Sequence, residues 1–325
     1  MSIICKVTRG SLLESAHIVY GVAIDENGNT LAVSGNADYV TCIRSAFKPF
    51  QAAASVKTGA VDAAGFNESE LALMCASHSG EEVHVETAQS MIKKLGYDLS
   101  YYECGKHFPY DIKSRQKLLI EKKELTQYHN NCSGKHAGML ALAKHLKVEP
   151  SGYTEPEHPV QQRILRLAQQ YTGLSEIPIG VDGCSAVAPF FSLRTIALLF
   201  QKLVKQDTSE LKRIFNAMVN NPYLIAGQNR FDTDFIRTLN GRGVTKIGGE
   251  AVRGVGIKTD KYGVVGIALK VLDGSQRCLS QATIAMLNRL DLLTDLEQQE
   301  LTKWSDEKRF NHRKIHVGDR KIIWE

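Results

Sequence analysis

The sequence lacks the segments that would place a protein in a membrane or outside the cell. No apolar run approaches the roughly 18 residues that a membrane-spanning helix needs. The N-terminal segment, residues 1–6, does not join a basic region to a long apolar one, so no secretory signal is visible. The 7 cysteines contain no CxxC pair, which favours free thiols over a disulfide framework. We therefore expect a cytoplasmic protein with no membrane partner.

The sequence also lacks the signature of a nucleic-acid-binding surface. The net charge of +5 is mild, and the most basic stretch, residues 308–321, is interpreted as a polar terminal element. There are no internal repeats, low-complexity segments or linkers. With 43% hydrophobic residues, the chain can bury a full core, and we expect residues 1–325 to form a single catalytic unit.

Hydrophobic patterning predicts strands at both ends of the chain and helices in the middle. Residues 17–24 and 30–34 flank an Asn-Gly turn and predict a β-hairpin, and residues 254–258 and 263–272 predict a second one. Helical periodicity appears between them. It covers residues 81–95, 111–125, 158–171, 191–203 and 210–219. The prediction is an α/β fold with an antiparallel sheet (approximately 1–45 and 240–325) and a central helical part (approximately 46–239).

The stretch Tyr39–Ala54 contains the first candidate for chemistry. It begins as a short strand and turns into a buried, Ala-rich helix, with Ser45 expected as the N-cap and Pro49 in the first turn. Ser45 and Lys48 would share one face of that helix. A hydroxyl beside a buried amine is a candidate nucleophile and base. The structural alternative is a capping serine and a lysine whose stem covers apolar surface.

Two further segments are rich in polar and reactive residues. Residues 128–138 contain two Asn, a Cys, a Ser, a Lys and two His before the apolar run that starts at Met139. A loop of this kind before a helix favours an anion or oxyanion site, although a well-capped helix start is the alternative. Residues 181–185 form a predicted turn at a strand end, where binding residues are common.

Several motifs together resemble one enzyme family. RSAFKPFQA, CASHSGEEVHVE, CGKHFPY, NNCSGKHAGMLA, EPEHPVQ, VDGC and GIALKVLDG occur in this order over nearly the whole chain. They resemble the bacterial L-asparaginase II family of the Rhizobium etli type. That family is similar in fold to serine β-lactamases and glutaminases, and the resemblance implies hydrolysis of L-asparagine to L-aspartate and ammonia through an acyl-enzyme.

The resemblance also implies roles for individual residues. It implies two Ser–Lys couples, Ser45 with Lys48 and Ser77 with Lys258. The implied substrate-binding residues are Arg44, His136, Asp182, Gly249 and Glu250. It further implies a homodimer and a zinc ion held by Cys132, Lys135 and Cys184, with no organic cofactor. Ala251 stands where the family has glycine, and alanine is disfavoured there if the position needs a positive φ.

The chemistry of amide hydrolysis explains why such residues are needed. The reaction requires a nucleophile, a base, donors for the oxyanion and an acid for the leaving ammonia. We expect Ser45 to be acylated with Lys48 as its base, and Ser77 and Lys258 to move the proton or assist deacylation. Which serine attacks first stays open. The alternatives are a glutaminase or other amide hydrolase on the same scaffold, and a non-catalytic amino-acid-binding protein.

Overall fold

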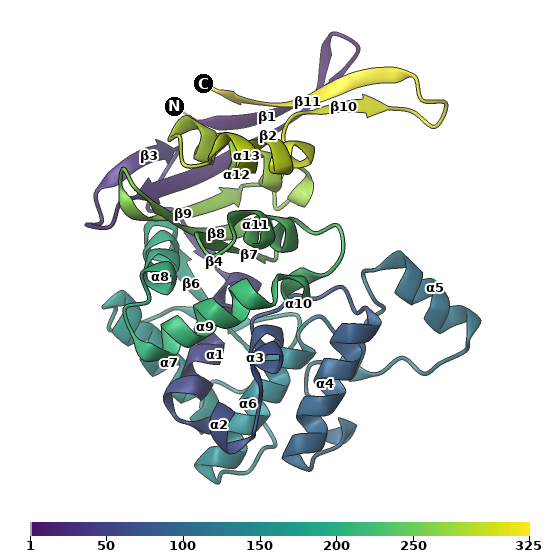
Figure 1. The fold of residues 1–325 in the computed structure, drawn as a ribbon, viewed down its shortest axis with the longest axis vertical. Helices are drawn as coiled ribbons and strands as arrows, with labels where there is room; N and C mark the ends of the chain where they lie inside the picture. The colour runs from purple at the N-terminus through teal and green to yellow at the C-terminus, as the bar shows by residue number, and fades with distance from the viewer. Residues whose placement is uncertain (1) are drawn as a thin grey trace. The chain divides into compact units, whose positions relative to one another are not determined.

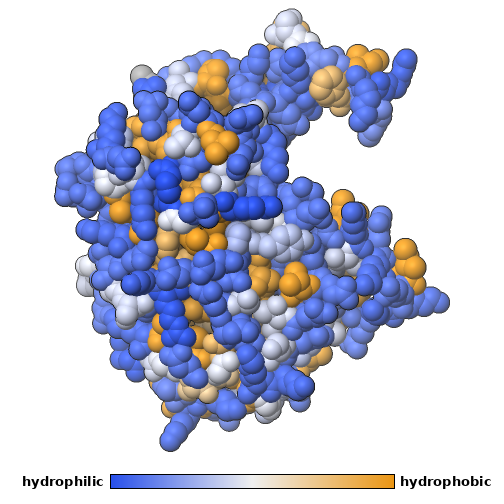
Figure 2. All heavy atoms as spheres, viewed as in Figure 1, coloured by the Kyte–Doolittle hydropathy of each residue, from blue (hydrophilic) through white to orange (hydrophobic). Residues whose placement is uncertain are grey.

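A computed structural model describes residues 2–325. These residues form two compact units. The sheet unit contains the chain up to Ala46, Phe191–Lys205 and Thr238–Glu325; the helical unit contains Phe47–Phe190 and Gln206–Arg237. No helix in residues 2–325 is long and apolar enough to cross a membrane. On the face drawn in Figure 2, hydrophobic groups are small and scattered among hydrophilic ones.

The sheet unit is built on one antiparallel sheet in the order β10-β11-β1-β2-β9-β8-β7, with β3 paired to β2. Its strands are β1 (Ile3–Arg9), β2 (Leu12–Ile24), β3 (Thr30–Ser34), β7 (Gly243–Gly248), β8 (Val252–Thr259), β9 (Gly263–Val271), β10 (Glu307–Phe310) and β11 (His316–Trp324). Ile3 pairs with Trp324, so the two chain ends lie side by side (Figure 1). The predicted antiparallel sheet drawn from both termini is confirmed.

Helices cover both faces of this sheet. They are α8 (Leu193–Lys205), α12 (Leu279–Arg289) and α13 (Asp295–Leu301), and the short strand β4 (Val40–Cys42) also belongs to the unit. α8 packs closely against the sheet at Gly254, where a Cβ atom would lie 2.0 Å from the ring of Phe200. On the opposite face, Met286 of α12 lies against Gly21 of β2. The central strands are therefore buried on both sides.

The helical unit surrounds one buried helix, α6. Its helices are α1 (Lys48–Lys57), α2 (Ala60–Ala63), α3 (Glu68–Met74), α4 (Glu82–Leu95), α5 (Ile112–Ile120), α6 (Ser133–Leu146), α7 (Pro159–Thr172), α9 (Ser209–Asn220) and α10 (Pro222–Ala226); α11 (Phe231–Leu239) follows, and β5 (Ile179–Val181) pairs with β6 (Val187–Ser192). Gly134 and Gly138 let α6 approach α3, since a Cβ on Gly134 would lie 2.3 Å from the Leu73 carbonyl oxygen.

Two local predictions are wrong. Ser45 is not a helix N-cap, because it lies in a 3-10 turn over Arg44–Phe47, and α1 begins after Phe47 without a side-chain cap. α5 ends at Ile120 rather than at residue 125. The structure also contains a strand, β7, that the patterning did not predict. The basic stretch 308–321 lies mostly in β10 and β11.

Candidate active site

The helical unit buries the amine of Lys48 among three oxygen atoms. Lys48 is the first residue of α1 and has no exposed surface. Its Nζ atom lies 2.5 Å from the Ala76 carbonyl oxygen, 3.1 Å from the Asn131 carbonyl oxygen and 3.1 Å from the Ser77 hydroxyl oxygen. Two segments far apart in the sequence thus meet at this amine.

Hydrogen bonds to α10 fix the segment that carries Ser77. Ser77 follows α3 and is 5% exposed. Its backbone N–H donates to the Ile225 carbonyl oxygen at 2.9 Å, and the hydroxyl of Ser79 donates to the Ala226 carbonyl oxygen at 2.8 Å. Both contacts attach the segment to α10. The main chain that carries the Ser77 side chain next to Lys48 is therefore hydrogen-bonded in place.

Three acceptor oxygens surround the Lys48 amine. Carbonyl oxygens can only accept hydrogen bonds, so the amine donates to Ala76 and Asn131. Its third hydrogen bond is donated to the Ser77 hydroxyl oxygen at 3.1 Å. An amine at this distance from a serine hydroxyl is within reach for proton transfer.

A second cluster joins Cys132, Lys135 and Cys184. The Nζ atom of Lys135 donates to the Cys184 sulfur at 2.8 Å. A hydrogen bond from Cys132, reinforced by the Lys135 charge and opposed by burial, lowers the pKa of Cys184 to about 5. The same hydrogen bond and burial raise the pKa of Cys132 to about 12. Burial opposes the charge on Lys135, but Cys184, Cys132 and Asp182 raise its pKa above the ordinary value. The cluster is a thiolate–ammonium pair with one neutral thiol.

The donor atoms of this cluster fit a zinc ion in type. Cysteine sulfurs are common zinc ligands, whereas a lysine must first lose its proton. Residues 2–325 contain no group of three or more His, Cys, Asp or Glu side chains placed to hold a metal. If Lys135 served as a ligand beside the two cysteines, its amine would have to lose a proton.

The described residues leave one buried ring nitrogen of His136, Nε2, without a hydrogen-bond partner. Its Nδ1 atom lies 2.7 Å from the hydroxyl oxygen of Tyr153, which also accepts from the backbone N–H of Glu103 at 3.0 Å. Because the Tyr153 oxygen already accepts from Glu103, we assign its hydroxyl proton to Nδ1, and this assignment places the imidazole proton on Nε2. Burial lowers the pKa of His136 to about 3, so the ring is neutral. Nε2 is buried and has no hydrogen-bond partner among the described residues.

The sheet unit holds the predicted substrate-binding and catalytic residues Arg44, Ser45, Gly249, Glu250 and Lys258. A Cβ on Gly249 would lie 3.0 Å from the guanidinium carbon of Arg44, so Arg44 lies directly over the turn after β7. Glu250 (φ 55°) and Ala251 (φ 54°) occupy the left-handed region, which confirms that position 251 is one where glycine would be unstrained.

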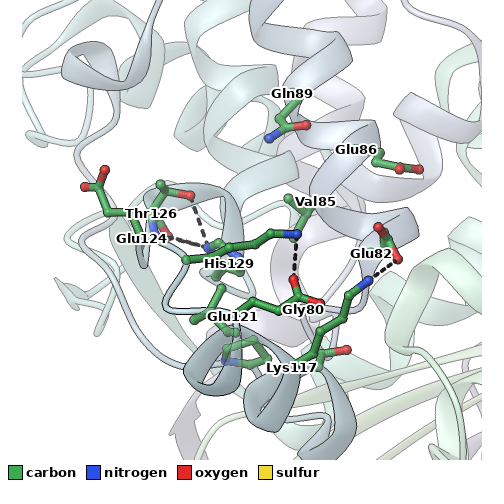
Figure 3. A pocket seen from close by; sticks show the side chains of 14 residues that line it. Gly80, Glu82, Val85, Glu86, Gln89, Lys117, Glu121, Glu124, Thr126 and His129 are labelled. Atoms are coloured by element: carbon green, nitrogen blue, oxygen red, sulfur yellow. Dashed lines mark hydrogen bonds and ion pairs between the residues drawn. The ribbon is translucent and has the colours of Figure 1, made fainter.

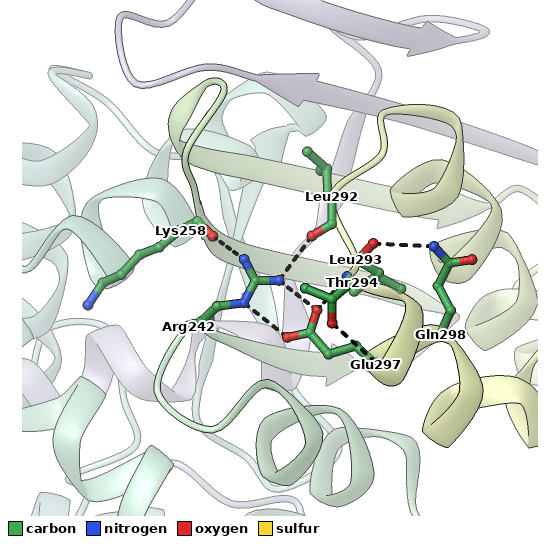
Figure 4. A network of polar contacts seen from close by, with 7 residues as sticks. All are labelled: Arg242, Lys258, Leu292, Leu293, Thr294, Glu297 and Gln298. Carbon is green, nitrogen blue, oxygen red and sulfur yellow. Dashed lines mark hydrogen bonds and ion pairs between the residues drawn. The ribbon is translucent and has the colours of Figure 1, made fainter.

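Lys258 lies at the end of β8, beside a polar network (Figure 4). The guanidinium of Arg242 donates to the Lys258 carbonyl oxygen at 2.9 Å and to the Glu297 carboxylate at 2.7 Å. The backbone N–H of Lys258 donates to the Arg242 carbonyl oxygen at 2.7 Å. The main chain of Lys258 is fixed by these contacts, and in Figure 4 its side chain extends away from Arg242.

A surface pocket of about 410 Å³ lies beside α4 and α5 and contains none of the predicted site residues (Figure 3). Two ion pairs lie among its lining residues. Lys117 donates to Glu82 at 3.1 Å, and Lys123 lies 2.7 Å from Glu121.

The structure thus brings together Lys48 with Ser77, Lys135 with Cys184 and Cys132, and Arg44 with Gly249. Asp182 lies in the turn between β5 and β6, where its carboxylate accepts from the Gly183 N–H at 2.7 Å. Sequence reasoning missed Tyr153 and the carbonyl groups of Ala76 and Asn131. Backbone carbonyls carry no residue signature, so no sequence pattern could have indicated them.

A buried amine hydrogen-bonded to a serine hydroxyl is an arrangement used by hydrolases that form acyl-enzymes. The family model of L-asparaginase II matches residues 5–322. The chain therefore belongs to the L-asparaginase II family. A search of curated proteins finds no match.

Solved structures with similar folds include Mglu (14% identity, TM-score 0.44, covering 84% of this chain and 60% of that chain). Others are a β-lactamase from Burkholderia ambifaria (12%, 0.40, 86% and 96%) and a Bacillus glutaminase (9%, 0.36, 84% and 91%). This chain thus spans less than two thirds of the length of Mglu.

Proposed function

We propose that the protein is an L-asparaginase that hydrolyses L-asparagine to L-aspartate and ammonia through a seryl acyl-enzyme. The observation that carries the proposal is the buried contact of 3.1 Å between the Lys48 amine and the Ser77 hydroxyl in a member of the L-asparaginase II family. A protein that only bound amino acids would gain nothing from burying an amine against a hydroxyl in this way.

The proposed reaction has two halves. A serine oxygen attacks the side-chain amide carbon, its proton passes to a neutral lysine amine, and the C–N bond breaks as the leaving nitrogen takes a proton and departs as ammonia. Water then attacks the ester and releases aspartate. We assign acylation to Ser45, three residues before Lys48 in the chain, with Lys48 as its base. Ser77 passes protons through its contact with Lys48, and Lys258 assists deacylation.

Substrate binding is assigned to individual polar residues. Asp182 is proposed to bind the α-ammonium group and Arg44 the α-carboxylate, with the Gly249–Glu250 turn beside Arg44. His136 is proposed to donate its open Nε2–H to a substrate oxygen, because a buried donor without a partner costs about 1–3 kcal/mol until an acceptor arrives. We also propose that residues 1–325 act as one catalytic unit.

Two single variants test the assignment of the serines. Ser45→Ala is expected to remove the acyl-enzyme that acid quenching and peptide mass spectrometry detect in the wild type, with kcat falling by more than about 10⁴-fold. Ser77→Ala is expected to lower kcat by about 10²–10⁴-fold. Ser114→Ala is the matched control, since Ser114 has the same spacing to Lys117 on α5. Retention of kcat within about tenfold by Ser45→Ala would refute the nucleophile assignment.

Substrate choice is tested by measuring ammonia release from L-asparagine and L-glutamine side by side. The proposal predicts a higher kcat/KM for asparagine. A preference for glutamine would make the protein a glutaminase instead. Thermal stabilisation by asparagine without release of ammonia would indicate a binding protein.

We also propose that Cys132, Lys135 and Cys184 bind zinc and that the protein forms a homodimer. The ion would have a structural role and would hold the start of α6 in place, because an activated serine does not need a Lewis acid. Metal analysis of protein purified without chelator should give about one zinc per chain, and much less would remove this part of the proposal. Light scattering of the purified protein tests the dimer.

A further inference from the structure

His78 follows Ser77 and has no part in the mechanism described above. Its ring is fully buried. The backbone N–H of Gly80 donates to Nδ1 at 3.1 Å, and Nε2 lies 2.9 Å from the Ser133 hydroxyl oxygen. Because Nδ1 accepts, the proton is on Nε2 and is donated to Ser133. Burial, with help from nearby His84 and Lys48, keeps the pKa of His78 well below 6.5, so the ring is neutral.

This imidazole joins the same two segments that hold Lys48. One segment provides the Ala76 carbonyl and the Ser77 hydroxyl, and it carries His78 itself. The other provides the Asn131 carbonyl and, two residues later, Ser133, the first residue of α6. The spacing of these segments determines where the three acceptors around the Lys48 amine lie. The hydrogen bond between His78 and Ser133 therefore links the two segments that surround that amine.

Two neighbouring rings hold His78 in its plane. His84 stacks on it with ring centroids 5.0 Å apart and an angle of 10° between the planes. Tyr223 stacks in turn on His84, with centroids 5.9 Å apart and an angle of 9°. A ring confined in this way cannot turn away from Ser133 without disturbing the stack.

We infer that His78 is a positioning residue that directs the Lys48 amine at the Ser77 hydroxyl by fixing the distance between the Ala76–Ser77 segment and the start of α6. The inference rests on the proposed function, in which proton transfer between Lys48 and Ser77 is part of catalysis. Loss of the hydrogen bond between His78 and Ser133 should reduce kcat more than it changes KM, since a displacement of about 1 Å at reacting groups can cost about 10²-fold in rate.

Three variants separate this role from general stability. His78→Leu removes both hydrogen bonds and should lower kcat about 10²-fold with KM within about threefold. His78→Gln places an amide nitrogen near the position of Nε2, keeps the donor to Ser133 and should recover most of that loss. Ser133→Ala should lower kcat and add nothing to His78→Leu, because both changes remove the same hydrogen bond between His78 and Ser133. His17→Leu, at a buried histidine hydrogen-bonded to Asp273, is the control.

Two measurements separate the test of the role of His78 from the test of the proposed substrate. Ammonia release from asparagine gives kcat and KM, and the rate of labelling by a fluorophosphonate gives serine activation without reference to any substrate. The inference predicts parallel losses in both, restored by His78→Gln. It is overturned if His78→Leu and Ser133→Ala keep the wild-type labelling rate within about threefold, or if their effects multiply. If the wild type releases no ammonia, the substrate is wrong, while the labelling rates still decide the role of His78.

Discussion

Replacing Tyr153 with phenylalanine tests how the site holds His136. The Tyr153 hydroxyl has two contacts, one to Nδ1 of His136 at 2.7 Å and one from the Glu103 N–H at 3.0 Å. Both partners lose their hydrogen bond in Tyr153→Phe. A buried polar group left without a partner costs about 1–3 kcal/mol, so the variant should lose about 2–6 kcal/mol of unfolding free energy.

The functional consequence follows from the imidazole proton. In the wild type, Tyr153 fixes that proton on Nε2, where it is proposed to face a substrate oxygen. Without the hydroxyl, Nδ1 can carry the proton instead, and Nε2 then presents a lone pair that repels a substrate oxygen. KM for asparagine should rise by about tenfold, which corresponds to about 1.4 kcal/mol of lost binding.

Urea unfolding measures the stability change, steady-state kinetics the change in KM, and nitrogen NMR of labelled histidine the tautomer. Tyr171→Phe is the matched control, because Tyr171 is also buried and donates to Glu210 at 2.9 Å in the same unit. It should lose stability without a change in KM. An unchanged KM in Tyr153→Phe, with His136 still protonated on Nε2, would show that the tyrosine does not set the tautomer.

Two further predictions concern stability. Lys147 follows the last residue of α6 at φ 56°, in the left-handed region. Glycine relieves the strain of this conformation but gains entropy in the unfolded chain, so Lys147→Gly should raise the unfolding free energy measured in urea by about 0.5–1 kcal/mol. A loss of stability would contradict the assigned strain. Burial lowers the pKa of His84, so the folded protein holds this ring neutral while the unfolded chain binds a proton below the ordinary value of 6.5. Stability should therefore fall as the pH drops through 6.5, and His84→Phe, which keeps the stack, should flatten this fall by up to about 1.4 kcal/mol per pH unit. Equal slopes in wild type and variant would exclude His84 as a contributor.

Much of the architecture could be predicted from the sequence because its signals are local. The Asn27-Gly28 turn between apolar runs specified the hairpin of β2 and β3. Helix α6 was expected only from Met139 but begins at Ser133. Every residue from Ser133 to Ala143 is buried, so the helix has no polar face to produce a periodic pattern, and its polar side chains resemble a loop in the sequence.

The candidate site was less predictable because its contacts depend on tertiary structure. Spacing linked Lys48 to Ser45, but in the structure the Lys48 amine contacts the hydroxyl of Ser77, 29 residues away in the chain. The family resemblance named Ser77 without indicating this contact. Tyr153 has no neighbour in the sequence that suggests a role, and only packing places its hydroxyl against His136. Residue types could be chosen from chemistry, whereas their pairing required the fold.

The central claim is that the buried amine of Lys48 transfers the proton in amide hydrolysis. The most direct measurement is ammonia release from L-asparagine by Lys48→Met, compared with Lys117→Met as a control from the exposed Ser114/Lys117 pair. The account predicts that Lys48→Met loses about 10²–10⁴-fold in kcat while circular dichroism shows it folded, and that Lys117→Met keeps full activity. A folded Lys48→Met protein with kcat within about tenfold of wild type would contradict the account.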